Sequence, residues 1–261
     1  MEIVIVQSQE QAGKLVADTV AALLKRKTDP VLGVATGSSP GAVYKELARR
    51  VEAGELSLRH AKAFMLDEYV GLSEEHPQRY RVVIDREFVE PTDIDPANVS
   101  GPEGTARDLV EACADYERQI HAAGGVDLQI LGIGTDGHIA FNEPGSSLAS
   151  RTRLKTLTRQ TRQDNARFFG GDIEAVPKHC LTQGVGTLME ADHLVLLAFG
   201  QPKAEAVHHM VEGPVSAMWP ATALQFHPHV TVLLDESAAS RLQLASYARQ
   251  AWESKPKWQG L

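Results

Sequence analysis

Three side chains that exchange protons lie within eight residues of one another: Asp136, His138 and Glu143. They belong to the segment Gly-Ile-Gly-Thr-Asp-Gly-His-Ile-Ala-Phe-Asn-Glu-Pro at residues 132–144, which follows the mostly apolar run 126–131. A carboxylate beside an imidazole fixes the tautomer of the ring and stabilises its protonated form. This spacing predicts acid–base chemistry in which protons move to and from a substrate oxygen.

Metal binding is the alternative use of these three residues. An Asp-x-His pair with a Glu five residues later matches no common zinc spacing, and Cys113 and Cys180 are not spaced as metal ligands. The histidine pairs at 208–209 and 227–229 are poorly arranged for ligation, and we expect them at the surface. The sequence therefore predicts no metal site.

Asp67, Glu68 and Tyr69 follow a second apolar run, residues 61–66. Because side chains alternate along an extended chain, one of two adjacent carboxylates points into a crevice while the other points away. A carboxylate at this place is suited to act as a general base if its geometry and pKa fit the substrate. The alternative is an Asp that caps a helix in a surface turn.

Small residues precede Pro40, between the apolar run 31–35 and a helical pattern: Thr36, Gly37, Ser38 and Ser39. Such residues at a helix N-terminus expose backbone N–H groups, and the helix dipole favours an anion there. The segment is neither a P-loop nor a dinucleotide fingerprint. It predicts either a phosphate site or an ordinary capping turn.

Positive charge is concentrated in two places of this acidic chain. Lys203 follows the apolar run 194–199, where its ammonium can reach a phosphate as a point charge. The irregular region 143–177 carries a local basic run: Arg151, Arg153, Lys155, Arg159, Arg162 and Arg167. For each of these cations, a solvated surface position is the alternative to a ligand contact.

Six apolar runs alternate with helical patterns along the chain, at residues 3–6, 31–35, 61–66, 126–131, 194–199 and 230–234. Helices are expected at 9–27, 40–53 and 105–123. The alternation predicts a single α/β domain over residues 1–261, with a doubly wound, mainly parallel, Rossmann-like sheet and helices on both faces. Ligands bind such sheets at the carboxyl ends of the strands, which is where the polar segments stand.

Composition excludes several classes of partner. The 261 residues are 43% hydrophobic and carry a net charge of −8, which argues against nucleic acid, although a sugar phosphate needs only two or three local cations. No stretch approaches the roughly 20 apolar residues of a membrane span, and the first residues are too acidic for a signal peptide. We therefore expect a cytoplasmic protein with no membrane or nucleic-acid partner.

Taken in order, these segments resemble the glucosamine-6-phosphate deaminases, also called glucosamine-6-phosphate isomerases, nearly end to end. The resemblance rests on residues 36–40, on Met-Leu-Asp-Glu-Tyr-Val-Gly-Leu at 65–72, and on residues 134–144, 146–153 and 185–188. It implies conversion of glucosamine 6-phosphate to fructose 6-phosphate and ammonia, without an organic cofactor or a catalytic metal.

The resemblance also implies a role for each candidate residue. His138 would open the pyranose ring by moving a proton between ring oxygens, while Asp136 and Glu143 hold and tune the imidazole. Asp67 would take the proton from C2 and support its transfer towards C1, which gives a fructose imine that water hydrolyses. The sugar phosphate would be bound by Thr36, Gly37, Ser38, Ser39, Arg167 and Lys203.

Some members of this family are activated by N-acetylglucosamine 6-phosphate at a subunit interface, and the family includes hexamers and smaller forms. We therefore expect a homo-oligomer, up to a hexamer. The residues that match the activator site are Ser146, Arg153, Lys155 and Thr156. An aromatic contact from the C-terminal helix is not matched, because Tyr247 is offset and Arg249 occupies the aligned position.

Two alternatives to the deaminase are weighed. A 6-phosphogluconolactonase shares the fold and the phosphate binding but needs no base for a C2 proton, so Asp67 in its Asp-Glu-Tyr setting favours the deaminase. A sugar-phosphate sensor without turnover usually carries a DNA-binding segment, whereas here the fold is expected to begin at residue 3.

Overall fold

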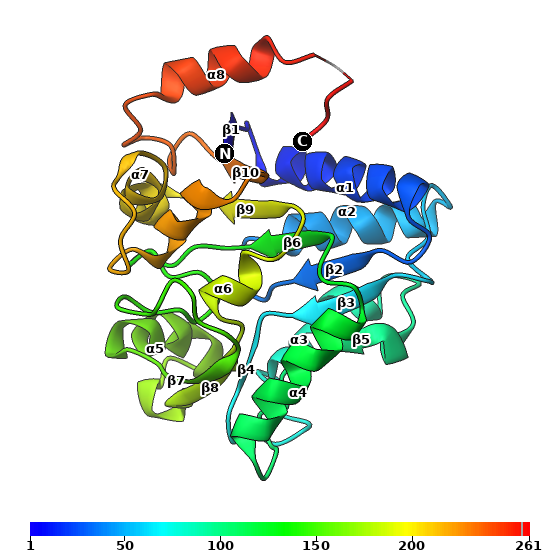
Figure 1. The fold of residues 1–261 in the computed structure, drawn as a ribbon, viewed down its shortest axis with the longest axis vertical. Helices are drawn as coiled ribbons and strands as arrows, with labels where there is room; N and C mark the ends of the chain where they lie inside the picture. Colours follow the sequence, from blue (N-terminus) through cyan, green and yellow to red (C-terminus); the bar gives the residue numbers. More distant parts are fainter. Residues whose placement is uncertain (257) are drawn as a thin grey trace.

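Seven strands form the central sheet of the computed structural model, which describes residues 1–256 and 258–261 (Figure 1). Every hydrogen-bonded pair in this sheet is parallel. The spatial order is β1 (Glu2–Ile5), β10 (Val230–Leu234), β9 (Leu194–Ala198), β6 (Leu128–Leu131), β2 (Val31–Val34), β3 (Lys62–Met65) and β5 (Val99–Ser100). The six predicted apolar runs are confirmed as strands, and the two-residue edge strand β5 was not predicted.

Apolar side chains cover both faces of the sheet, as expected for buried parallel strands. Val195 and Leu197 of β9 face a core that they share with α1 (Gln9–Arg26) and α2 (Gly41–Glu52). Leu194 and Leu196 face the opposite core, which includes residues of α4 (Leu109–Ala122), α6 (Val185–Leu188) and α7 (Ala204–Glu212). The doubly wound α/β fold is therefore confirmed.

The remaining helices close the edges of the molecule. Helix α8 (Ala245–Glu253) lies beside the edge strand β1, at the top of Figure 1. Helix α3 (Tyr80–Ile84) runs into the π-helical turn η1 (Asp85–Val89). The short 3-10 segments are η2 (Pro96–Asn98), η3 (Ala166–Phe169), η4 (Ile173–Ala175), η5 (Gln201–Lys203) and η6 (Pro220–Phe226). None of the described helices is long and apolar enough to cross a membrane.

The start of α4 corrects the predicted helix 105–123. The Asp108 side chain accepts hydrogen bonds from the N–H groups of Val110 and Glu111, at 3.0 Å each, so the helix begins after it. An N-cap residue has non-helical dihedrals, and this capping therefore excludes the preceding residues from the helix. The predicted helices 9–27 and 40–53 are confirmed as α1 and α2, with ends displaced by one residue.

A second sheet of three antiparallel strands was not predicted. It consists of β4 (Asp67–Tyr69), β8 (His179–Thr182) and β7 (Arg153–Thr156), and it packs with α5 (Arg159–Asn165) at the lower left of Figure 1. Strand β4 has only three residues, and the sequence Arg-Leu-Lys-Thr of β7 resembles a solvated segment. The region 143–177, which the sequence predicts to be irregular, therefore contributes to a small second sheet beside the main one.

The expected surface position of the histidine pair at 227–229 is wrong for its first member. His227 is buried, and its Nε2 lies 2.7 Å from the carbonyl oxygen of Ala191. Beside it, the rings of His193 and His229 stack with centroids 3.6 Å apart. These histidines lie where β9 and β10 begin, so they are at the amino end of the sheet.

The sheet reverses its winding between β2 and β6. From β2 the chain adds β3 and β5 on one side, and it then returns to pair β6 with the other side of β2 before it continues to β9 and β10. In open α/β sheets, ligands bind outside the carboxyl ends of the strands at such a switch point. The four adjacent strands β3, β2, β6 and β9 therefore define where a site is expected.

Candidate active site

The three residues of the segment after β6 come together in the structure. His138 Nδ1 lies 2.7 Å from Asp136 Oδ1 and 3.7 Å from Glu143 Oε2. The short contact is not aligned as a regular hydrogen bond, so its attraction is chiefly that of an ion pair when the ring is protonated. These distances confirm the prediction that both carboxylates lie close to the imidazole.

Unusual backbone conformations shape this loop. Gly137 has φ +81°, and Ala140 has φ +49°, which makes it the one described non-glycine residue with a positive φ. Such left-handed conformations persist where surrounding contacts fix them, and they gather at functional sites. Here Gly134 N–H donates to the carbonyl oxygen of His138 at 2.8 Å, and buried Asn142 donates to the carbonyl oxygen of Ile139 at 3.0 Å.

A separate segment, residues 216–222, ties both ends of the loop. Ala221 N–H donates to Gly137 O at 2.9 Å, and Gly145 N–H donates to Ala217 O at 2.8 Å. The indole of Trp219 fills the space beside Gly137, because a Cβ atom at that glycine would lie 2.6 Å from Trp219 Cε3. The loop is therefore held by hydrogen bonds and packing before any ligand is present.

The two carboxylates of the loop have different electrostatic environments. Burial disfavours the charged form of Asp136, but the attraction of the His138 imidazole outweighs it and lowers the pKa of the Asp136 carboxyl to about 2. Burial raises the pKa of Glu143, although Thr158 N–H donates to its Oε1 at 3.1 Å. The Asp136 carboxyl is therefore more acidic than that of Glu143.

The same trio is a potential metal-binding group. Among the described residues, the donor atoms of Asp136, His138 and Glu143 lie within 4.8 Å of one another. A metal ion would have to separate Asp136 from His138 Nδ1, and it would compete with the contacts that Thr158 makes to Glu143. The arrangement fits proton exchange better than ligation, and a metal-free site stays a prediction.

Asp67 lies at the carboxyl end of β3, in the first position of β4, where it pairs with Thr182 of β8. Its side chain is buried with only 6% of the residue exposed, and no described group donates a hydrogen bond to its carboxylate. Burial raises its pKa well above the ordinary value, and the charge of Glu68 adds to the effect. A buried carboxylate without a partner is a strong base held ready for a substrate proton.

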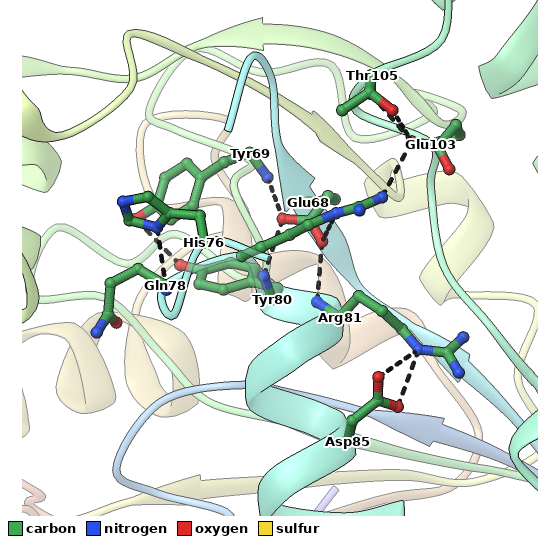
Figure 2. A network of polar contacts seen from close by, with 10 residues as sticks. Glu68, Tyr69, His76, Gln78, Tyr80, Arg81, Asp85, Glu103 and Thr105 are labelled. Atoms are coloured by element: carbon green, nitrogen blue, oxygen red, sulfur yellow. Dashed lines mark hydrogen bonds and ion pairs between the residues drawn. The ribbon is translucent and has the colours of Figure 1, made fainter. Parts of the chain in front are cut away.

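Glu68 is the carboxylate that points away, as the alternation along the strand predicted. Its side chain accepts hydrogen bonds from the N–H groups of Tyr69, Tyr80 and Arg81, at 2.8, 2.9 and 2.9 Å (Figure 2). It also lies 3.7 Å from Arg79 Nε. Glu68 therefore anchors the start of α3 to β4, which fixes the backbone that carries Asp67.

The small residues after β2 lie next to β6 at the switch point. Gly37 and Ser38 are exposed, while a Cβ atom at Gly132 would lie 3.8 Å from Ser39 Oγ. Gly37 has φ +101°, which favours glycine at this turn. No side chain caps the N-terminus of α2, so the N–H groups of Gly41 and Ala42 have no partner among the described residues and favour an anion.

The two cations predicted to bind phosphate have no anionic partner among the described residues. In the described part of the chain, neither Arg167 nor Lys203 forms an ion pair, and Arg167 Cζ lies 4.6 Å above the ring of Phe168. Burial lowers the pKa of Lys203 and the charge of Arg167 adds to this, while Asp164 and Asp136 act in the opposite direction. A bound anion would satisfy both cations.

The residues matched to the activator site lie on β7 and, for Ser146, just after the His138 loop, where Ser146 N–H donates to Glu143 O at 3.0 Å. Ser146 Oγ and Arg153 Nη2 are buried without a hydrogen-bond partner among the described residues. Lys155 is half-buried and Thr156 is exposed on the same strand. Buried polar atoms are rarely left unpaired, so this pair of atoms marks a second polar position.

Three residues near the site were not assigned a role from the sequence. Asn165 Nδ2 donates to Tyr69 Oη at 3.1 Å, and the Tyr80 hydroxyl donates to the same oxygen at 3.3 Å. Tyr69 belongs to the segment 65–72 that carries the family resemblance, but an aromatic residue there is also expected from core packing. Tyr80 and Asn165 have no signal in the sequence, because their contact depends on tertiary folding.

The ends of neighbouring strands therefore carry the residues of two chemical functions. Asp67 comes from the end of β3, and the trio centred on His138 comes from the end of β6. The anion-binding groups come from the ends of β2 and β9 and from η3. Such an arrangement can hold a phosphorylated molecule at one end while two separate bases act on its other end.

Comparison of the sequence with known proteins identifies the family of the chain. The sequence matches the family described as glucosamine-6-phosphate isomerases/6-phosphogluconolactonase over residues 6–233. Proteins named glucosamine-6-phosphate deaminase from Beutenbergia cavernae and Mycolicibacterium smegmatis are 69% and 66% identical, over the full length of both chains in each case.

Solved structures give the same fold. A structure described as a monomeric glucosamine-6-phosphate deaminase is 42% identical, with a TM-score of 0.89 over 92% of this chain and 99% of its own. A 6-phosphogluconolactonase from Leishmania guyanensis is 20% identical, with a TM-score of 0.73 over 92% of this chain and 98% of its own. The second likeness establishes a shared fold alone.

Proposed function

The chain belongs to the family of glucosamine-6-phosphate isomerases and 6-phosphogluconolactonases, and from this premise we propose that it converts glucosamine 6-phosphate to fructose 6-phosphate and ammonia. The observation that carries the proposal is the buried Asp67, a second base whose strand partner Thr182 accepts the N–H of Phe141, from the loop of the His138 trio, at 3.0 Å. Isomerisation of an aldose needs a base for a carbon proton in addition to a group that opens the ring.

The phosphate is bound by Thr36, Gly37, Ser38 and Ser39 together with Arg167 and Lys203. The N-terminus of α2 supplies N–H groups, and the two cations without partners supply charge. Fixing the phosphate places the other end of the sugar against the two bases, so that the reaction becomes effectively unimolecular.

Ring opening is the task of His138. The imidazole moves the proton of the anomeric hydroxyl to the ring oxygen, which breaks the bond between C1 and that oxygen and gives the open-chain aldehyde. During this transfer the imidazole of His138 is protonated, and the Asp136 carboxylate 2.7 Å away stabilises that form. Glu143, held by Thr158, orients the same nitrogen from 3.7 Å.

Asp67 then moves the carbon-bound proton. Its carboxylate takes the proton from C2 while a proton moves from the substrate ammonium to O1, which gives an enol with the amino group retained, and Asp67 then returns its proton to C1. The resulting imine at C2 adds water and releases ammonia, which leaves the ketose. The raised pKa of Asp67 makes it a stronger base than an ordinary carboxylate, as a C–H proton requires.

An ammonia-release assay on glucosamine 6-phosphate tests the proposal, with 6-phosphogluconolactone as the comparison substrate. We expect ammonia from the amino sugar and no accelerated lactone hydrolysis. The Asp67→Asn variant should lose ammonia release while it still binds inorganic phosphate. Asp192→Asn, at an exposed residue before β9 at the opposite end of the sheet, is the matched control. Lactone hydrolysis without ammonia would favour the lactonase, and binding without turnover would favour the sensor.

We also propose that Ser146, Arg153, Lys155 and Thr156 form a second anion site, at which N-acetylglucosamine 6-phosphate activates the enzyme. The unpaired atoms Ser146 Oγ and Arg153 Nη2 support this assignment, and burial lowers the pKa of Arg153. Initial rates measured against substrate with and without the acetylated sugar phosphate test it. An unchanged hyperbolic curve would exclude activation.

The position of the C-terminal helix α8 relates the proposed activator site to the oligomeric state. Helix α8 lies beside β1, at the opposite end of the molecule from β7 in Figure 1, so its side chains would reach an activator site only in a second subunit. Its Arg249 pairs with Glu236 at 2.6 Å. A homo-oligomer, up to a hexamer, is the assembly proposed, and light scattering during size-exclusion chromatography distinguishes it from a monomer like the 42% identical relative.

The proposed substrate also suggests where the enzyme works. Phosphorylated amino sugars are charged metabolites that form and are consumed inside cells, so we place the reaction in the cytoplasm, in the breakdown of amino sugars such as N-acetylglucosamine. Separation of cell fractions, followed by the ammonia-release assay on each, tests this placement.

A further inference from the structure

We propose that Tyr69 and Asn165 are positioning residues that hold the segment bearing Arg167 against the strand bearing Asp67. One hydroxyl would then couple phosphate capture to the placement of the carbon base. The inference rests on the proposed function for its catalytic meaning, and on contacts of the described residues for its structural basis.

The hydroxyl of Tyr69 is the meeting point of three elements. Tyr69 stands two residues after Asp67 in β4 and is 2% exposed. Its oxygen accepts a hydrogen bond from Asn165 Nδ2 at 3.1 Å, and Asn165 is the last residue of α5, two residues before Arg167. The same oxygen accepts the hydrogen bond of the Tyr80 hydroxyl at 3.3 Å, from the first residue of α3.

Aromatic packing surrounds this hydroxyl. The rings of Tyr69 and Tyr80 lie 4.7 Å apart between centroids, and Figure 2 shows them side by side. Phe169 of η3 meets Tyr69 edge-on at 5.8 Å. Phe141, two residues before Glu143, stacks on Tyr80 at 6.0 Å. The packed rings stabilise the contact of β4 with α3 and η3. The hydrogen bonds of the Tyr69 hydroxyl fix the positions of α3 and α5 relative to β4.

The hydroxyl network also has an electrostatic link to the phosphate loop. Burial raises the pKa of the Tyr80 hydroxyl, and the Thr36 side chain, in the loop after β2, acts in the opposite direction. The hydrogen bonds themselves run from Tyr80 through Tyr69 to Asn165. They connect α3 with α5, which the sequence separates by about 75 residues.

Arg167 needs such an anchor because its own surroundings are sparse. It is exposed on a four-residue 3-10 segment, and its guanidinium lies over the ring of the neighbouring Phe168. A long cation on a short exposed segment loses much conformational freedom when it binds an anion. The Asn165–Tyr69 hydrogen bond reduces that loss by fixing the backbone two residues away.

Three variants test the proposal: Tyr69→Phe, which keeps the ring and removes the hydroxyl, Asn165→Ala, and the double variant. Loss of one hydrogen bond should weaken phosphate contacts, so KM for glucosamine 6-phosphate should rise about three- to tenfold while kcat stays within about twofold. The dissociation constant of inorganic phosphate, measured by calorimetry, should rise by the same factor. The double variant should be no weaker than Tyr69→Phe, because removing the Tyr69 hydroxyl already removes the hydrogen bond that Asn165 makes.

Tyr247→Phe is the matched control, since Tyr247 is exposed on α8 far from the site. Unchanged KM and unchanged phosphate affinity in Tyr69→Phe and Asn165→Ala would overturn the proposal, and so would additive effects in the double variant. Calorimetry of phosphate needs no turnover. If the wild-type protein released no ammonia, the proposed function would fail while the phosphate data still decided the role of Tyr69.

Discussion

Replacing Asp136 with Asn removes a charge from the ring-opening trio while it keeps the shape of the side chain. The Asp136 pKa of about 2, against an ordinary value of 3.8, measures how far the attraction of the imidazole exceeds the cost of burial. At about 1.4 kcal/mol for each pH unit, this excess is about 2–3 kcal/mol. The imidazole shares it with the backbone N–H of His138, which donates a hydrogen bond to Asp136 Oδ1 at 3.2 Å.

If ring opening passes through the protonated imidazole, the variant loses stabilisation of this order in the transition state. A loss of about 2–3 kcal/mol corresponds to a rate lower by about 30- to 150-fold. We therefore expect kcat/KM for glucosamine 6-phosphate to fall by a factor of this order in Asp136→Asn. Initial rates of ammonia release at pH 7 to 8 measure it, with the exposed Asp115→Asn on α4 as the control for an Asp-to-Asn change.

A second measurement separates chemistry from binding. The alditol obtained by reducing the substrate has no ring to open, yet it carries the same phosphate and amino group. Its affinity should be the same in the variant and the wild-type protein to within about twofold, because Asp136 acts on the ring-opening proton alone. Wild-type kcat/KM in Asp136→Asn, or an equal loss of affinity for the alditol, would refute the assigned role.

Three further perturbations have defined outcomes. Glu68→Gln removes a like charge that raises the pKa of Asp67, so the acid limb of the pH–rate profile should move to lower pH, and an unmoved limb would show that this charge does not reach Asp67. Gly137→Ala places a Cβ atom in a left-handed backbone and against Trp219, so urea denaturation should show an unfolding free energy lower by about 2–3 kcal/mol, and unchanged stability would contradict the packing described. Burial lowers the pKa of His193 to about 3, so the unfolded chain binds a proton that the folded chain excludes between pH 6.5 and 3. Stability is full above pH 6.5 and should fall by up to about 2 kcal/mol at pH 5, and urea curves with the same midpoint at pH 7.5 and 5 would contradict this.

The sequence predicted the main sheet because its strands are buried on both faces. All five residues of β9 and of β10 are buried, and both segments are mostly apolar, so their sequences predict strands. The polar segments after β2, β3 and β6 were predicted as site segments because they follow the carboxyl ends of strands. The antiparallel layer could not be predicted in the same way. The Arg-Leu-Lys-Thr of β7 alternates between half-buried and exposed positions, and β4 has three residues whose strand character depends on pairing with β8.

The candidate site was predicted unevenly for related physical reasons. Asp136, His138 and Glu143 are close in sequence, so their proximity in space required only a tight loop. Asn165 and Tyr69 are 96 residues apart, and their hydrogen bond exists only because α5 packs on the small sheet. The burial that raises the pKa of Asp67 is likewise a property of the folded layers.

Strand β1 pairs with β10 from Glu2↔Thr231 onward, so the first strand of the sheet finds its partner about 230 residues later in the chain. Contacts between such distant segments make folding slow, because a long loop must close before they form. At a synthesis rate of about 5–20 residues per second, β1 waits roughly 10 to 45 seconds on the ribosome before β10 has been made. The inner strands β2, β3 and β6 can pair earlier, so they, together with the loops that hold the bases, have time to assemble while the outer edge of the sheet is still open.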